Sequence, residues 1–291
     1  MKKITPLTFA LLLCLGLQVQ GQSHRETQSL VIDVDKYEEI HFYNKHGEVN
    51  VRGVDGTTAR IDGERKLRSK SKSKLEQAKA EIYLDTFTVD NALVIFINNP
   101  FYQLEGDYES PFMYYDSRQE FKHPNIWKKR YVNFEFDVEI EVPRASNLTV
   151  ATHSGDLKVS QILGLLSAKN HHDDVTLEDV SDLYHVHTHH GDIKVSLTKA
   201  LEGDIDFDTH HGDITVSMPS VPSAEIHFDS HHGDFYTDFD WRAISRNIQD
   251  VSSSKRKTKY KLGDKTLVQM GDGDHTLTFD THHGDMYLLQ L

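Results

Sequence analysis

Histidine pairs followed by glycine and aspartate recur through the second half of the chain. Four copies follow the pattern Thr/Ser-His-His-Gly-Asp, at 188–192, 209–213, 230–234 and 281–285. Imidazole nitrogens are ligands for Zn²⁺, Cu²⁺ and Ni²⁺, and carboxylates can add oxygen ligands or orient the imidazoles. If the copies stack as strands do, equivalent histidines lie about 4.8 Å apart and neighbouring imidazoles can tilt towards one ion.

The metal-binding hypothesis uses the first histidine of each copy, and in the last three copies also the aspartate two residues before it. The candidate ligands are His153, His171, His189, His210, His231, His282, Asp208, Asp229 and Asp280. Zinc or copper would be the bound ion, and no other cofactor is expected. The competing hypothesis is structural: histidines at a corner stack on one another, hydrogen-bond the turn and spread through the copies by duplication.

Enzymatic motifs are missing from the sequence. It contains no Gly-x-Ser-x-Gly elbow, no His-Glu-x-x-His pair and no phosphate-binding glycine loop. Catalysis also needs one asymmetric site whose groups are tuned apart, whereas identical copies offer many equivalent positions. We therefore predict a protein that is not an enzyme.

The spacing of the copies predicts a repeat fold. Weaker copies occur at 152–156 and 170–174, and a distant one at 44–48. The fourth positions of successive copies, from Gly155 to Gly233, are 18, 18, 21 and 21 residues apart, and a step of 51 leads to Gly284. A fixed period marks a solenoid whose units bury their apolar faces by stacking, and the long step marks an insertion, at 238–265.

Each copy lies between two short segments with alternating apolar residues, which is strand chemistry. Glycine would supply the positive φ of a tight turn, and aspartate would hydrogen-bond its own backbone there. Because residues two apart in a strand share a face, Phe207 and Thr209 face the core, while Asp208 and His210 face outward. The second histidine stands at the turn and is interpreted as a corner residue.

The rest of the chain is less regular. We predict a helix near 69–80, strands at 81–89, 93–97 and 132–142, and another helical stretch near 238–250, with the chain rejoining the solenoid at 267. An aromatic-rich loop at 100–130 either binds a partner or caps the stack. The predicted divisions are a signal peptide (1–21), N-terminal strands with a first rung (22–60), an insertion-bearing β segment (61–143) and the repeat solenoid (144–291).

Residues 1–21 resemble a secretory signal: Lys2 and Lys3 precede an apolar run and small residues at its end. Cys14, the single cysteine, lies in that run, so no disulfide is expected in the mature chain; acylation of Cys14 is the alternative. No later segment is apolar enough to span a membrane. The net charge of -13 argues against a nucleic-acid partner, although 65–79 and 255–261 are basic.

The segment Phe134-Glu-Phe-Asp-Val-Glu-Ile-Glu-Val-Pro143, followed by the Thr-His-Ser-Gly-Asp unit at 152–156, resembles the bacterial "putative adhesin" β-solenoid family of cell-envelope proteins. The last unit, with Gly271-Asp-Gly273 before it, resembles the end of that family's pattern. The resemblance covers roughly residues 30–291 and implies a stacked β-solenoid without known catalytic residues. Histidine stands where the family often has serine.

These observations together predict an all-β protein, a repeat β-solenoid of stacked strand-turn-strand rungs. The leading functional hypothesis is a non-enzymatic, exported module of the periplasm or cell surface, adhesin-like or a scaffold, that contacts an envelope or surface protein or a glycan. The alternative is a histidine-rich protein that buffers or senses divalent metal ions.

Overall fold

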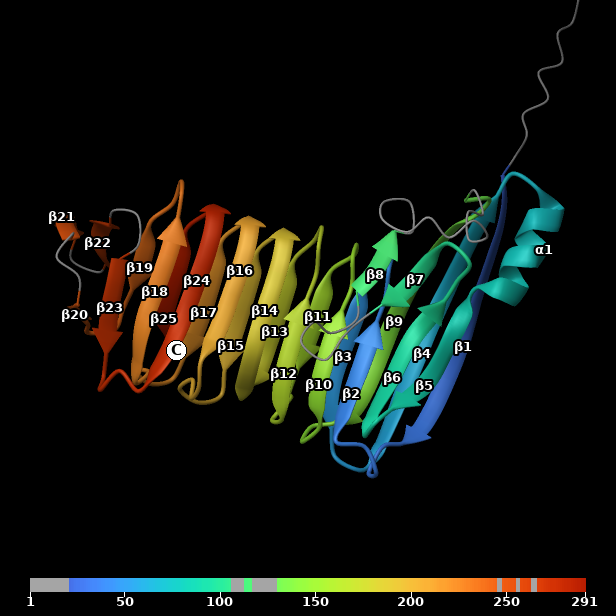
Figure 1. Cartoon of the computed structure of the whole chain (residues 1–291), viewed down its shortest axis with the longest axis horizontal. Helices are drawn as coiled ribbons and strands as arrows, with labels where there is room; N and C mark the ends of the chain where they lie inside the picture. The colour runs from blue at the N-terminus through green and yellow to red at the C-terminus, as the bar shows by residue number, and fades with distance from the viewer. Residues whose placement is uncertain (1–20, 106–112, 117–129, 245–247, 255–256, 263–265) are drawn as a thin grey trace, which may run out of the picture.

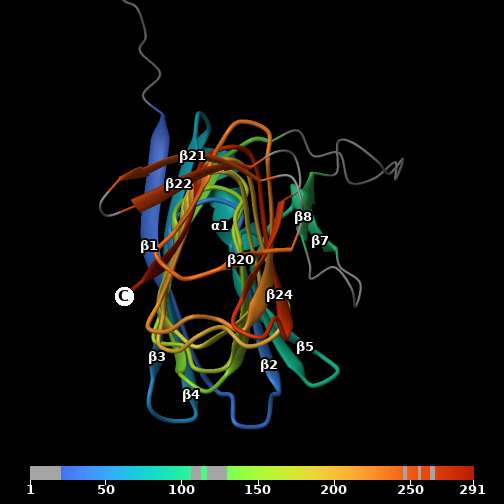
Figure 2. The same cartoon turned by 90° about the vertical axis from the view of Figure 1, so that its left-hand side faces the viewer.

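The structure is a computed structural model that describes residues 21–105, 113–116, 130–244, 248–254, 257–262 and 266–291. Two long sheets lie face to face and the chain winds between them, so that the rungs superpose as a flattened coil when viewed along the stack (Figures 1 and 2). The predicted all-β solenoid is confirmed. The predicted signal peptide lies outside the described residues, except for Gly21.

The first sheet has twelve strands. In spatial order they are β1 (Gln22–Asp33), β4 (Thr58–Ser69), β9 (Asn133–Pro143), β3 (Val49–Val54), β11 (Leu157–Ser160), β13 (Val175–Val180), β15 (Ile193–Leu197), β17 (Ile214–Met218), β25 (Met286–Gln290), β19 (Phe235–Thr237), β22 (Lys257–Leu262) and β21 (Ile248–Ser254).

The second sheet has eleven strands. In spatial order they are β20 (Arg242–Ala243), β23 (Thr266–Met270), β18 (Ala224–Ser230), β24 (His275–His283), β16 (Ile205–His211), β14 (Asp182–His190), β12 (Leu165–Lys169), β10 (Asn147–Ala151), β2 (Glu39–Tyr43), β6 (Ala92–Asn98) and β5 (Tyr83–Val89). A separate hairpin pairs β7 (Tyr102–Glu105) with β8 (Met113–Asp116).

We call a rung one strand of the second sheet, the following strand of the first sheet and the turn between them. Alternation places one side of every strand in the core, as in β16, where Ile205, Phe207 and Thr209 are buried and their neighbours are not. The rungs pair in parallel and in register, so equivalent residues stack: the rings of Phe207 and Phe279 lie 5.0 Å apart. The stacking produces one continuous core along the molecule.

The order of the rungs in space differs from their order in the sequence. The last rung, β24–β25, lies between β16–β17 and β18–β19. Phe279 pairs with Phe207 on one side and with Phe228 on the other. Stacking in sequence order would place His210 beside His231, but a rung formed some 50 residues later separates them.

The ends of the stack hold the irregular segments. The predicted helix near 69–80 is confirmed as α1 (Lys72–Glu81), which buries Leu75 and Ala78 at one end of the molecule (Figure 1). The helix predicted near 238–250 is wrong: the described residues there form β20 and β21. β22 pairs antiparallel with β19, and β23 with β18. The insertion thus extends both sheets, because edge strands at the end of a stack need partners.

The aromatic loop at 100–130 lies largely outside the described residues. At its start, the buried ring of Phe101 packs against Tyr131 and Phe134, with ring centroids 5.1 Å and 6.2 Å away. The described residues include no helix with the length and apolarity needed to cross a membrane.

Candidate functional site

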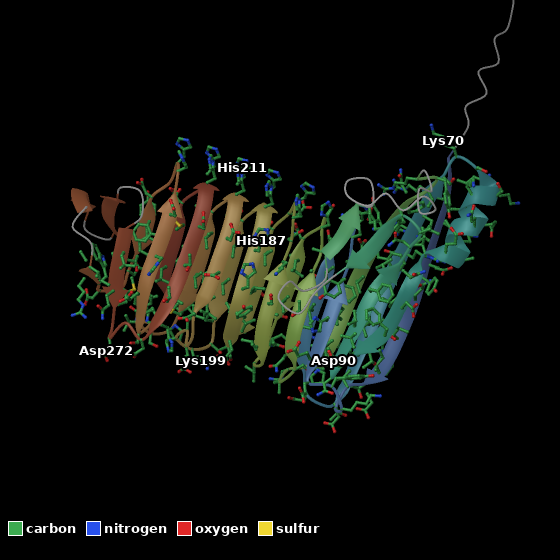
Figure 3. The ribbon with its side chains drawn as sticks, in the orientation of Figure 1. Lys70, Asp90, His187, Lys199, His211 and Asp272 are labelled. Carbon is green, nitrogen blue, oxygen red and sulfur yellow. The ribbon has the colours of Figure 1, made fainter. Side chains whose placement is uncertain are left out.

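The histidine-bearing turns lie one above another along a single edge of the solenoid, which we call the histidine edge. Its turns, in spatial order, are 44–48, 152–156, 170–174, 188–192, 209–213, 281–285 and 230–234. Figure 3 shows His211 on this edge, with Lys199 and Asp272 on the opposite one. The distant copy at 44–48 therefore joins the array, because β2 pairs in parallel with β10.

The first residue fastens most of the turns to the neighbouring rung, although the buried hydroxyl of Thr152 has no partner among the described residues. The buried hydroxyl of Thr281 donates to the carbonyl of Gly212 at 3.2 Å, and that of Thr209 donates to the carbonyl of Gly191 at 3.1 Å. In the 170–174 turn, the amide Nδ2 of Asn170 reaches the carbonyl of Gly155 at 3.0 Å. A buried side-chain donor at this position satisfies a carbonyl at the corner that the sheet leaves unpaired.

Glycine is required at the fourth position because the rungs approach closely there. A Cβ on Gly284 would lie 1.9 Å from the carbonyl oxygen of Gly212, and one on Gly212 would lie 2.0 Å from that of Gly191. Gly212 has a positive φ of 154°, whereas Gly284 does not belong to the positive-φ residues. Close approach, more than the φ angle expected from the sequence, therefore explains the recurrent glycine.

The fifth residue forms a ladder of its own. The backbone N–H of Asp213 donates to Oδ1 of Asp192 at 3.0 Å, that of Asp285 to Oδ1 of Asp213 at 2.8 Å, and that of Asp234 to Oδ1 of Asp285 at 2.9 Å. Each of these carboxylates accepts a hydrogen bond from the next rung. From the sequence, we expected it to accept from the backbone of its own turn. These aspartates hold the rungs together.

The histidines of the turns form two parallel columns. The inner column contains, in spatial order, His153, His171, His189, His210, His282 and His231; the outer column contains His46 and, beyond Ser154, His172, His190, His211, His283 and His232. Ring centroids of His189 and His210 lie 5.0 Å apart with planes 7° from parallel, and those of His210 and His282 lie 4.8 Å apart at 3°. Within one turn the rings meet edge to face.

The columns differ in exposure. The outer histidines of the five rungs from 170–174 onward are exposed, so the second histidine of the pair points into solvent at the corner, whereas His46 and most of the inner column are partly buried. The Nδ1 atoms of His171, His189 and His282 are buried and have no hydrogen-bond partner among the described residues. Such nitrogens are stable only as neutral lone-pair carriers, because a buried N–H without a partner is costly.

Burial is also the main influence on the charge of these rings. Together with a smaller contribution from nearby positive charges, it lowers the pKa of His153 to about 3 and that of His171 to about 4. Burial and neighbouring imidazoles lower the pKa of His189 and His282 as well. The imidazoles of these residues are therefore neutral at pH 7, the state in which a histidine binds metal.

Residues 26–288 match the Toastrack DUF4097 family. The chain belongs to this family. The match confirms the family resemblance and the solenoid fold inferred from the sequence. No curated protein matches the chain.

Two solved structures align with nearly the whole of this DUF4097 chain at low identity. A "putative cell adhesion protein" from Clostridium sporogenes covers 92% of this chain and 100% of its own, with 11% identity and a TM-score of 0.43. A "putative adhesin" from Bacteroides fragilis covers 91% and 97%, with 11% identity and a TM-score of 0.31.

The six histidines named from the sequence all lie in the inner column, as their strand parity predicts. The three named aspartates lie together on the second sheet as an acidic stripe, in which Asp280 pairs in register with Asp208 on one side and Asp229 on the other. Burial and the two flanking carboxylates raise the pKa of Asp280. Asp208 also accepts from Nδ1 of His187 at 3.0 Å.

One group of three metal-ligating side chains converges within the described part of the chain. It combines the predicted ligands His153 and His171 with His172, a corner residue that was not among the predicted ligands. None of the three named aspartates belongs to this group. The sequence signal that could have indicated it is Asp173, which stands where every other copy has glycine.

Proposed function

We propose that this DUF4097 chain is a non-enzymatic, exported, adhesin-like module of the bacterial cell envelope that binds a surface protein or glycan through its histidine edge. The observation that carries the proposal is the regularity of the outer column. Equivalent exposed imidazoles repeat at about 5 Å over five rungs, as in the pairs His190–His211 and His211–His283. A periodic array suits an extended or repetitive partner, since many equal contacts add avidity.

The described surface favours binding over catalysis. A hollow of about 830 Å³ lies on the outer face of the first sheet, and its charged groups are engaged in ion pairs such as Arg52–Glu141 and Arg60–Asp62. A catalytic centre needs an acid and a base whose environments differ at one point. The rungs instead repeat the same environment along the molecule.

The signal-like pattern of residues 1–21 supports export. A chain without cysteine beyond Cys14 can fold in an oxidising compartment without pairing errors, and its hydrogen-bonded ladders replace disulfides as cross-links between rungs.

Binding of the labelled mature chain to isolated envelopes tests the proposal. A variant with His190, His211 and His283 changed to serine should bind at least about tenfold more weakly, because the repeated contacts are lost together. The matched control changes Lys199 and Asp272 on the opposite edge and should bind as the native chain does.

Treating the envelopes with protease or with periodate separates a protein partner from a glycan. Full binding by the histidine variant would show that the edge is not the binding surface. No binding by the native chain would contradict the adhesin-like function itself.

A further inference from the structure

The histidine edge is irregular at one place, where His153, His171 and His172 meet. One nitrogen from each of these imidazoles lies within 4.8 Å of the other two. Along the rest of the columns, rings of neighbouring rungs stack with their centroids about 5 Å apart, as in the pairs His190–His211 and His210–His282. Three converging nitrogens from two rungs are the donor set of an open zinc site, which takes three protein ligands and water.

The sequence of the 170–174 turn accounts for the irregularity. Asp173 replaces the usual glycine, and its Oδ2 accepts the backbone N–H of Gly155 at 2.7 Å. The outer-column stack widens there, to 5.7 Å between His172 and His190, compared with 5.0 Å for the next pair. The ring of His172 stays within 5° of parallel to that of His190 and stands edge-on to His153, with centroids 4.8 Å apart and planes at 78°.

The neighbouring rung leaves room for the edge-on contact between His172 and His153. Ser154 holds the outer-column position next to His172, so a small side chain stands where another imidazole would otherwise stack. The rings of His153 and His171 are inclined by 34° with centroids 4.6 Å apart, whereas inner-column pairs in the middle of the stack, such as His189–His210, are nearly parallel. His171 stays stacked on His189 at 4.9 Å and 8°, so the convergence comes from the inclined ring of His153 and the displaced ring of His172.

We propose that His153, His171 and His172 bind a divalent transition-metal ion, Zn²⁺ or Cu²⁺, with one nitrogen from each ring and water completing the coordination. Bonds of about 2.0–2.1 Å in a tetrahedral arrangement require nitrogens about 3.3 Å apart. Rotation of the exposed His172 ring and small tilts of the other two close the present separation. This site is independent of the adhesin-like function, since it uses two turns at one end of the edge.

Two further observations fit a metal at this position. Nδ1 of His171 is buried without a hydrogen-bond partner among the described residues, so it carries a lone pair that nothing else uses. Burial also keeps His153 and His171 neutral at pH 7, so an incoming ion has no proton to displace from these two rings. The acidic stripe takes no part, because its carboxylates lie on the face of the second sheet.

A competition titration with a chromogenic zinc chelator tests the site. The mature chain is purified without a histidine tag and stripped with EDTA before the titration. The native chain should bind one Zn²⁺ tightly, and His172→Ser should weaken that binding at least about tenfold, since even partners outside the ligand shell change metal affinity by that factor. His283→Ser, an exposed outer-column histidine several rungs away, is the matched control and should leave the tight site unchanged.

Asp173→Gly is the sharper variant, because it removes no imidazole. It restores the regular turn, so the separation of His172 from His190 should close towards the 5.0 Å of the next pair and draw His172 away from His153, and zinc affinity should fall by a factor similar to that of His172→Ser. Circular dichroism of each variant establishes that it is folded; His172 is exposed, so its replacement leaves the core intact.

The outcomes separate the alternatives. Weak zinc binding by the native chain, or equal affinities for the native chain and His172→Ser, would overturn the proposal. Equal losses in His172→Ser and His283→Ser would also overturn it, because they would show diffuse binding along the columns.

Discussion

The close approach of the turns predicts a large cost for a single methyl group. In Gly284→Ala, the added Cβ would lie 1.9 Å from the carbonyl oxygen of Gly212. Real Cβ atoms do not approach other heavy atoms closer than 3.0 Å. The two rungs must therefore move apart by about 1 Å at this corner. The atoms that the Cβ would meet belong to the backbone and not to the end of a flexible side chain, so neither rung can move without a loss of packing.

Three hydrogen bonds cross the gap that must open. The Thr281 hydroxyl donates to the Gly212 carbonyl at 3.2 Å, the Gly212 N–H donates to the His283 carbonyl at 3.0 Å, and the Asp285 N–H donates to Oδ1 of Asp213 at 2.8 Å. At about 1 kcal/mol each, their weakening removes about 3 kcal/mol, and residual strain adds about 1 kcal/mol. We expect Gly284→Ala to lower the free energy of unfolding by about 4 kcal/mol.

Gly203→Ala is the matched control. Gly203 has a positive φ of 106° but open space around its Cβ position. It should lose only the backbone strain of an alanine at positive φ, about 1–2 kcal/mol. Urea unfolding followed by circular dichroism measures both variants. If Gly284→Ala costs no more than Gly203→Ala, then the contact between rungs does not explain the recurrent glycine.

Three further predictions concern the same edge. Asp213→Ala removes the acceptor of the Asp285 N–H and should cost about 1–2 kcal/mol in urea unfolding, whereas Asp213→Asn keeps an oxygen acceptor and should cost less; equal costs would argue against the ladder. Thr281→Val loses the hydroxyl that satisfies a neighbouring carbonyl and should cost about 1 kcal/mol or more, and an unchanged unfolding midpoint would contradict that role. Burial holds the pKa of His153 near 3 and of His171 near 4, below about 6.5 in the unfolded chain, so the unfolded state binds more protons and stability falls as pH drops through this window. With EDTA present, we expect a loss of about 2 kcal/mol between pH 7.5 and pH 5 after halving for partial exposure, and a flat profile would refute it.

Local patterns predicted the elements well where a residue's own neighbours decide its structure. The alternation at 132–142 corresponds to β9 (Asn133–Pro143), and the helical segment near 69–80 corresponds to α1 (Lys72–Glu81). Alternation also placed the first histidine of each copy on the outward face. These predictions needed only strand and helix periodicity.

Long-range order could not be predicted in the same way. The rungs are so similar that either β18 or β24 could pair with β16. The sequence pattern therefore does not predict that the later rung, with β24, is inserted between the two earlier ones. The prediction of a second helix near 238–250 was wrong for a related reason. Residues 248–254 pair with β22 at the end of the first sheet, and that pairing outweighs local helix propensity.

The metal candidate was half predicted. Parity placed His153 and His171 in one column, but the edge-on contact of His172 with His153 depends on how Asp173 replaces a glycine contact and on Ser154 in the next rung. Those are contacts between turns 18 residues apart, and their effect on a ring orientation is tertiary. A substitution in an otherwise invariant turn position is the sequence signal for such a change.

The contacts within the turn divide its five residues into two groups. The threonine, glycine and aspartate positions engage the adjacent rung in most turns, as at Thr209, Gly212 and Asp213, so these positions serve the fold. The two histidine positions do not: Lys45 holds the inner position in the first turn and Ser154 holds the outer position in the second, with the same rung pairing. Stacked histidines moreover have their pKa lowered by burial and by one another, as at His189 and His282, a cost that serine would avoid. Since the backbone accepts other residues at both positions, the persistence of histidine through the later rungs points to a role for imidazole at the surface, where a partner or an ion can reach it.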